Sequence, residues 1–327
     1  MENRSAYTEQ NRIIAKILHL YYVENCSQIE IARQLGLSTT KINRMIMTAR
    51  QSGMVEVNIR MPFVNLVDLE SRMVSLSNLR DVIIAPSLDN SPEGDLSLLA
   101  QIVASYLISQ IRPKDTICIG GGRTVTEIID HVQPHKITGI RIYPAIGGVQ
   151  HNSNLDVNHC ATQLAQKLGG EAMQFYAPAF AETEAERDTL LGLTHVVRAL
   201  EYACSARIGL FGIGDLDIGS SIVQYCPLPY SELADLVKLN SAVGEMLGFA
   251  FDSQGCGCIP EVNRRAIGIS LDDIRRLPMR IGAAVGAKKA RAIAAAIRGG
   301  YFTNLILDEN AARQVISILE EEPVVNS

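Results

Sequence analysis

The spacing of apolar residues changes near residue 80, from a helical period to an alternation of short apolar runs and amphipathic stretches. Before that point, apolar residues recur every three or four positions from Ile13 to Tyr22 and again through 27–53, which predicts helices. After it, short apolar runs alternate with helical patterns nearly to the C-terminus, which predicts strands between helices. We therefore expect a small helical domain joined to a much larger α/β domain.

The segment 27–53 predicts two short helices joined by a tight turn. Ser27 and Glu30 form a capping box, in which each side chain accepts a hydrogen bond from the other residue's backbone N–H. Gly36 supplies the left-handed residue that ends the first helix, and Ser38 is a suitable N-cap for the second. With 13–22 as a preceding helix, the pattern is typical of a helix-turn-helix domain. An ordinary helical hairpin is the alternative.

The second of these helices carries a polar face that suits DNA. Its apolar stripe recurs at helical spacing and leaves hydroxyls, an amide and two cations on the outside. Such groups contact base edges and phosphates when a helix lies in the major groove. The candidate DNA-reading residues, with the N-cap included, are Ser38, Thr39, Thr40, Lys41, Asn43 and Arg44.

Charge indicates a polyanionic partner for the N-terminal end alone. Residues 1–60 hold 8 Lys+Arg against 5 Asp+Glu, which leaves 22 of the chain's 30 cations and 30 of its 35 anions to the remainder. The net charge of −5 excludes a general nucleic-acid coat. A small local positive excess instead suits a few specific contacts, made stronger by pairing two or more such modules.

A strand and a helix are expected between the two domains. Met54 to Ile59 alternate in polarity, as a short strand does. An apolar seam follows at helical spacing, made of Leu66, Leu69, Met73 and Leu76. Such a seam either packs against its own domain or associates with a second copy of the chain.

The long C-terminal part predicts a doubly wound, mostly parallel sheet. Apolar strands between helices are typical of a parallel sheet buried on both faces. The expected strands are 82–85, 116–119, 140–143, 207–211, 280–285 and 304–307, and the expected helices are 96–111, 124–131, 161–168 and 290–297. We assign residues 1–60 to the helix-turn-helix domain, 61–80 to a linker and oligomerisation helix, and 81–327 to an effector-binding domain.

Three loops of this sheet are rich in glycine. The run from Gly120 to Thr124 ends one strand and opens a helix, while Gly147-Gly148 and Gly212-Ile213-Gly214 end two others. Ligands bind in the loops after the carboxyl ends of parallel strands. Bare N–H groups at a helix N-terminus, beside a guanidinium and a hydroxyl, form a natural anion cradle. A glycine turn without a ligand is the alternative.

Two lysines support an anionic ligand. Lys288 and Lys289 stand at the start of the helix 290–297, where the helix dipole is already positive. Each charge there costs up to about 1 kcal/mol unless an anion is present or solvent screens it. A phosphate held between these lysines and the loop at Gly122 would remove that cost.

Composition excludes several classes of protein. The chain has no apolar run of 18 residues and no signal peptide, so we expect neither membrane insertion nor secretion. Seven scattered cysteines indicate a reducing cytoplasm. The close pair Cys256 and Cys258 lacks neighbouring residues with metal-ligand spacing. We expect no metal and no cofactor.

Five stretches together resemble the SorC family of sugar-responsive bacterial transcriptional regulators. They are the helix-turn-helix, IGGGRTVTEI, AVGEMLGFAFDSQG, RRAIGISLDDIRRLP and GAKKARAIAAAIRGGYFTNLILDENAA. The resemblance covers essentially the whole chain and implies a C-terminal domain similar in fold to ribose-phosphate isomerase and CoA-transferase domains. It also implies a phosphorylated sugar or related metabolite as effector, homodimers or homotetramers on operator DNA, and control of a carbohydrate catabolic operon.

The resemblance also implies which residues bind the effector. They are Gly120, Gly122, Arg123, Thr124, Gly147, Gly148, Gly214, Asp252 and Lys289. The loop at Gly122 would hold the phosphate, Lys289 would pair with the phosphate or hydroxyls, and Asp252 would accept hydrogen bonds from hydroxyls. Arg123 departs from the family pattern, which often has a smaller or acidic residue there, and Glu245 stands where aspartate is expected.

Two other functions remain open at this point. The C-terminal domain could be an isomerase or deaminase that acts on a sugar phosphate, with the N-terminal domain as an oligomerisation domain. Such chemistry needs a general base and a paired acid. The loops offer Asp252, whereas Asp215 and Asp217 have the pattern of solvated loop residues. The chain could also sense an unphosphorylated sugar or polyol, although a neutral ligand does not need an anion cradle. We expect a regulator and not an enzyme.

Overall fold

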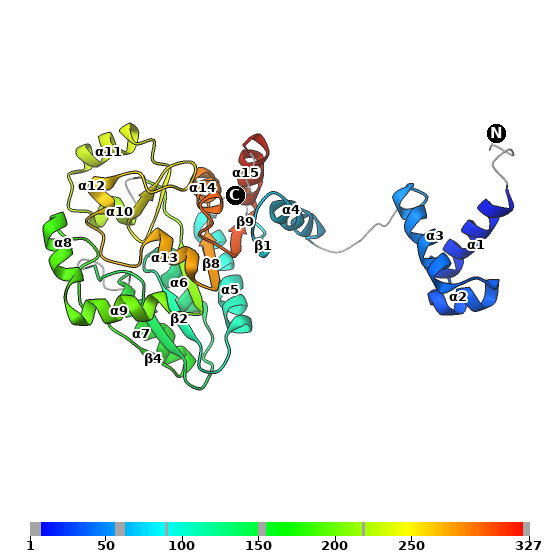
Figure 1. Ribbon diagram of the computed structural model, residues 1–327, viewed down its shortest axis with the longest axis horizontal. Coiled ribbons are helices and arrows are strands. Elements are labelled where there is room, and N and C mark those ends of the chain that lie inside the picture. The colour runs from blue at the N-terminus through cyan, green and yellow to red at the C-terminus, as the bar shows by residue number, and fades with distance from the viewer. Residues whose placement is uncertain (1–7, 56–62, 89–90, 150–154, 218–219, 323–327) are drawn as a thin grey trace. The chain divides into compact units, whose positions relative to one another are not determined.

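Contacts divide the chain into two units, Met1–Pro62 and Phe63–Ser327, and each is considered by itself. The computed structural model describes residues 8–55, 63–88, 91–149, 155–217 and 220–322. Figure 1 shows the helices of the first unit and the sheet and helices of the second. The strand expected at Met54 to Ile59 lies, beyond its first two residues, outside the described residues.

The first unit is a bundle of three helices, as expected. They are α1 (Glu9–Tyr22), α2 (Gln28–Leu35) and α3 (Thr39–Gln51). The capping box at the start of α2 is present: Ser27 N donates to Glu30 Oε2 (2.8 Å) and Glu30 N donates to Ser27 Oγ (3.3 Å). Gly36, with a φ of 63°, ends α2. The buried core that joins the helices is Ile17, Leu20, Ile31, Ala32, Ile42 and Ile46.

The expected linker helix belongs to the second unit. It is α4 (Val64–Ser75), and the seam residues Leu66, Leu69 and Met73 are buried in the same apolar cluster as the first strand and the last helix of the α/β unit. Arg72 on the outer side of α4 forms an ion pair with Glu320. The buried side of the seam thus packs against its own domain, and a role of this helix in oligomerisation stays a prediction.

The second unit is built on a seven-stranded parallel sheet, which confirms the predicted doubly wound fold. In spatial order, the strands are β1 (Asp81–Ala85), β9 (Asn304–Asp308), β8 (Met279–Ala284), β5 (Ile208–Gly212), β2 (Thr116–Ile119), β3 (Arg141–Pro144) and β4 (Glu171–Ala172). Every strand predicted for this sheet is present, and its two-residue β4 was not anticipated. Parallel pairing places the carboxyl ends of all these strands at one edge.

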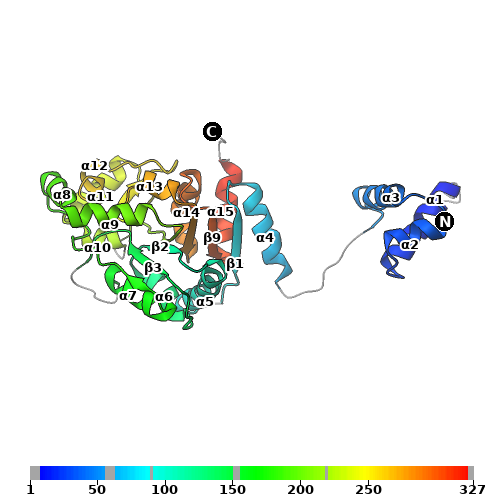
Figure 2. The ribbon, with the colours of Figure 1, turned by 60° about the horizontal axis from the view of Figure 1, so that its bottom comes forward.

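Helices cover both faces of the sheet (Figure 2). One face packs against α5 (Pro92–Gln110), α6 (Arg123–His131) and α7 (Val157–Leu168). The other packs against α9 (Thr194–Cys204), α13 (Leu271–Arg276), α14 (Ala290–Arg298) and α15 (Glu309–Glu321). Because successive side chains of a strand point to opposite faces of the sheet, β2 contributes to both cores. Ile117 and Ile119 lie in the first cluster, and Cys118 lies in the second.

The remaining elements lie in the connections between strands. They are α8 (Glu184–Leu191), α10 (Ser221–Tyr225), α11 (Tyr230–Leu239), α12 (Pro260–Asn263), a 3₁₀ turn (Ala287–Lys289), and an antiparallel hairpin of β6 (Gly244–Met246) and β7 (Phe249–Phe251). Among the residues that the structure describes, no helix is long and apolar enough to cross a membrane.

Candidate functional site

A cavity of about 310 Å³ lies where the loops after β2, β3, β5 and β8 meet. These strands are adjacent in the sheet, so their carboxyl ends bring the loops together. Seven of the nine residues expected to bind the effector line the cavity: Gly120, Gly122, Arg123, Thr124, Gly147, Gly214 and Lys289. The three glycine loops therefore converge, as predicted.

Gly122 allows α6 to begin at the wall of the cavity. Its φ of 90° lies in a region that favours glycine, and it is the N-cap of α6 without a side chain that could bond the first turn. Gly122 N donates to Leu155 O (3.0 Å), which fixes the loop. The first turn of α6 thus presents N–H groups without a capping side chain, together with the positive end of the helix dipole.

Arg123 and Thr124 follow in this first turn and both line the cavity. Arg123 is exposed, and within the part of the chain that the structure describes it has no ion-pair partner. A guanidinium without a partner beside a helix N-terminus is suited to a phosphate, to which it can donate two parallel hydrogen bonds.

Lys289 is the partly buried cation of the cavity. Its Nζ donates a hydrogen bond to Ile213 O (2.9 Å) in the loop after β5. Burial lowers the pKa of Lys289, and the carboxylates of Asp215 and Glu245 act in the opposite direction. A bound anion would stabilise the protonated amine in the same way as these carboxylates.

Glu245 is the buried carboxyl of the cavity. It lies on β6 with 5% of its surface exposed, and its Oε2 accepts a hydrogen bond from Gly248 N (3.1 Å). Burial raises the pKa of Glu245 to about 7. Gly214 leaves room for this carboxyl, because a Cβ on Gly214 would lie 2.1 Å from Glu245 Oε1.

The hairpin turn that carries Glu245 to the cavity was missed in the sequence. Leu247 and Gly248 have φ values of 51° and 77°, and both line the cavity. Two positive φ values are typical of a tight two-residue hairpin turn. Gly248, which stands between Met246-Leu247 and the apolar run 249–251, was the available signal, and it is weak because leucine rarely takes the first position of such a turn.

Gly148 and Asp252 do not line the cavity, and the predictions for both need correction. Gly148 is turned toward α7, where a Cβ would lie 2.8 Å from Asp156 Oδ2. Asp252 is a turn former: its Oδ1 accepts hydrogen bonds from Gln254 N and Cys256 N, both at 2.9 Å. Its carboxylate is therefore already satisfied within its own loop.

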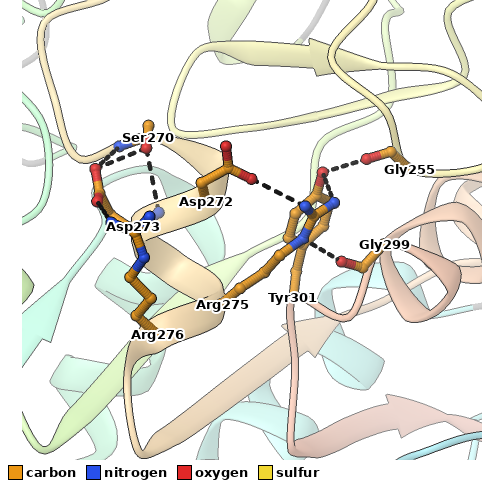
Figure 3. A network of polar contacts seen from close by, with 8 residues as sticks. All are labelled: Gly255, Ser270, Asp272, Asp273, Arg275, Arg276, Gly299 and Tyr301. Atoms are coloured by element: carbon orange, nitrogen blue, oxygen red, sulfur yellow. Dashed lines mark hydrogen bonds and ion pairs between the residues drawn. The ribbon is translucent and has the colours of Figure 1, made fainter. Parts of the chain in front are cut away.

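A network of polar contacts reaches Gly255 in the loop after β7, which is the loop that also holds Asp252 (Figure 3). Tyr301 Oη donates to Gly255 O, and Arg275 Nε donates to Gly299 O at 2.6 Å. Arg275 Nη1 also pairs with Asp272 Oδ1 (2.9 Å). These contacts tie the loop to α13 and to the segment between α14 and β9.

Asp215, which the sequence suggested to be a solvated loop residue, lines the cavity with its side chain only 16% exposed. Lys288 Nζ lies 3.4 Å from Asp215 Oδ2 and 3.2 Å from the exposed Asp217 Oδ2. Asp215 is shielded because the loop after β5 pairs with β6 through Gly214 and Glu245. Such long-range pairing cannot be read from the local sequence.

The outer face of α3 is exposed, as a DNA-reading helix requires. All six residues predicted to contact DNA lie at the surface: Ser38, Thr39, Thr40, Lys41, Asn43 and Arg44. Ser38 Oγ accepts a hydrogen bond from Lys41 N (3.3 Å), which confirms it as the N-cap. The opposite side of α3, with Ile42 and Ile46, is buried in the bundle.

The described residues hold no group of three or more His, Cys, Asp or Glu side chains that could bind a metal. Cys256 and Cys258 are free thiols in the loop after β7.

Comparison with known proteins gives a consistent result. The sequence model of a family described as "Putative sugar-binding domain" matches residues 61–317. The chain is 29% identical over 302 residues to the erythritol catabolism regulatory protein EryD of Brucella abortus, with 91% of this chain and 94% of that protein covered. It is 28% identical over 323 residues to the deoxyribonucleoside regulator of Bacillus subtilis, with 95% and 99% covered.

A solved structure agrees over nearly the whole chain. The full-length sorbitol operon regulator SorC of Klebsiella pneumoniae superposes with a TM-score of 0.73 at 25% identity, covering 94% of this chain and 100% of that one. These relatives are named as regulators and not as enzymes.

Proposed function

Because the chain belongs to the SorC family of sugar-binding transcriptional regulators, we propose that a phosphorylated sugar in the strand-end cavity controls its binding to operator DNA. The relatives regulate transcription and are not enzymes, which supports the expected regulator over the isomerase or deaminase alternative. The regulated genes would form a carbohydrate catabolic operon, and the protein would act in the cytoplasm.

The observation that supports a phosphorylated effector is the set of positive groups on one cavity. These groups are the start of α6, which has no capping side chain, the partly buried Lys289, and Arg123, which has no ion-pair partner among the described residues. Glu245 is partly protonated near neutral pH, because its pKa is about 7, and Asp215 is the other carboxyl there. The cations thus exceed the anions, and a dianionic phosphate would offset the difference.

Thermal unfolding with matched pairs of a sugar and its phosphate tests the effector class. A ligand at a hundred times its Kd adds about 2.7 kcal/mol to the stability. We expect stabilisation by one phosphorylated member and much less by its unphosphorylated partner. Lys289→Ala should abolish the shift, whereas Lys238→Ala, an exposed lysine on α11, should not. Equal shifts for sugar and phosphate would favour a sensor of free sugars or polyols.

The α3 face would read the operator. We expect Arg44→Ala and Asn43→Ala to weaken binding to the promoter region beside the gene while leaving effector binding intact. Arg33→Ala, which removes an exposed cation from α2, is the matched control. Unchanged promoter affinity for Arg44→Ala, measured by fluorescence anisotropy, would overturn the assignment of this face.

Gating would act through paired subunits. Two copies of the first unit in a homodimer or homotetramer would contact successive major grooves about 34 Å or a multiple apart. An effector that binds one arrangement of the sensor units more tightly shifts the population toward it and changes operator affinity. Light scattering during effector titration would show the assembly, and a monomer on DNA would contradict it.

A further inference from the structure

Two buried polar atoms at the cavity have no hydrogen-bond partner among the described residues. They are Asp215 Oδ2 and Ser220 Oγ. Ser220 is 7% exposed, and both residues line the cavity and belong to the loop after β5. A buried polar group without a partner destabilises the fold, and native proteins rarely contain one without a reason.

The charges around this pair decide what kind of group could satisfy it. Lys288 Nζ lies 3.4 Å from Asp215 Oδ2, an ion pair that does not form a hydrogen bond. A carboxylate only accepts hydrogen bonds, so a phosphate oxygen placed against it would be repelled. A hydroxyl can donate to Asp215 and at the same time accept from, or donate to, Ser220.

We infer that Asp215 and Ser220 form a hydroxyl-binding subsite, separate from the phosphate cradle of α6, and that the effector is a polyhydroxylated phosphate. The inference rests on the proposed phosphorylated effector, and it specifies that the part of the effector away from the phosphate carries hydroxyls. The loop after β5 lies between the cradle after β2 and the lysines after β8, so one molecule can contact all three. A phosphate whose carbon chain lacks hydroxyls would leave both atoms unsatisfied.

Calorimetric titration of the full chain tests this with inorganic phosphate and a series of polyol phosphates: glycerol 3-phosphate, erythritol 4-phosphate, ribitol 5-phosphate and sorbitol 6-phosphate. We expect at least one polyol phosphate to bind more tightly than inorganic phosphate. The measured quantity is the Kd for inorganic phosphate divided by the Kd for the polyol phosphate. A change in the overall charge of the cavity affects both Kd values and therefore cancels in the ratio.

Two variants and one control complete the design. The preference for the polyol phosphate should fall about tenfold in Ser220→Ala and tenfold to a hundredfold in Asp215→Asn, since a hydrogen bond to a charged group is the stronger. Asp217→Asn is the control. It removes the other carboxylate that pairs with Lys288, at an exposed position, and should leave the ratio unchanged. Ser220→Ala removes no hydrogen bond among the described residues, so its melting temperature should not fall.

The possible results separate the two proposals. Phosphate binding with an unchanged ratio in both variants would overturn the hydroxyl-binding subsite alone. Equal losses in Asp217→Asn would also overturn it, because the effect would then be general electrostatics. If the wild-type chain binds neither phosphate nor any polyol phosphate, the phosphorylated effector itself fails, and the subsite fails with it.

Discussion

Glu245 should make the stability of the α/β unit depend on pH in a direction unusual for a carboxyl group. Its pKa is about 7 in the folded protein against an ordinary value of 4.5. The folded protein therefore holds this proton more tightly than the unfolded chain does. The stabilisation is fully present below pH 4.5 and is lost as the pH rises through 7.

The magnitude follows from the two pKa values. At about 1.36 kcal/mol for each pKa unit, the difference between 7 and 4.5 corresponds to about 3 kcal/mol. Solvent does not screen this effect appreciably, because Glu245 is 5% exposed. Glu245→Gln has the same shape and cannot titrate. The free energy of unfolding of the wild type, minus that of Glu245→Gln, should therefore fall by about 3 kcal/mol between pH 4.5 and 8.

Labelling of the Cys118 thiol in urea measures unfolding of this unit alone. Cys118 lies on β2 and is 0% exposed, so it reacts only when the sheet opens. Mass spectrometry would identify the labelled residue and separate it from Cys26 in the first unit. The difference between the free energies of unfolding of the wild type and of Glu245→Gln could instead stay constant across this pH range, or rise with pH. Either result would refute the assignment of Glu245 as the buried proton-binding group.

Three further substitutions test the fold of the α/β unit. Gly214→Ala should lower the free energy of unfolding by about 1–3 kcal/mol, because its Cβ would lie 2.1 Å from Glu245 Oε1. In urea unfolding, the double variant with Glu245→Ala should recover most of this loss, and additive losses would contradict the clash. Gly122→Ala should lower the free energy of unfolding by about 1–3 kcal/mol, because a φ of 90° is strained for alanine, and it should weaken phosphate binding in calorimetry. An unchanged stability together with an unchanged phosphate affinity would argue against the cradle. Met73→Ala should destabilise the α/β unit by about 2–5 kcal/mol, because this side chain is 0% exposed. If light scattering instead shows that the subunits dissociate while the stability is unchanged, α4 acts as an oligomerisation helix.

The elements that the sequence predicted are those determined by local periodicity and capping. The capping box at Ser27 depends only on residues within one helical turn, and it is present as expected. The strand Thr116–Ile119 was predicted at its observed bounds because a short apolar run between two helical patterns is typical of a buried parallel strand. Convergence of the glycine loops then follows from parallel pairing.

The parts that the sequence did not predict depend on contacts between distant segments. Asp252 and Glu245 are carboxylic acids on the same hairpin, and the local pattern cannot tell which one faces the cavity. Backbone N–H groups satisfy Asp252 within its own loop, whereas Glu245 points past Gly214 into the cavity. Likewise, the spacing of Leu69 and Met73 shows that α4 has an apolar side but does not identify its partner.

The division of the cavity between main chain and side chains has a consequence for how regulators of this fold can diversify. The walls at Gly120, Gly122 and Gly147 consist of backbone, whose N–H groups are the same whatever residues surround them. Asp215, Ser220 and Glu245 contribute through side chains that a single substitution can replace. One half of the proposed recognition is therefore inherited with the fold, and the other is open to change. New effectors could then be acquired by a few exchanges, without rebuilding the proposed anion-binding edge of the sheet.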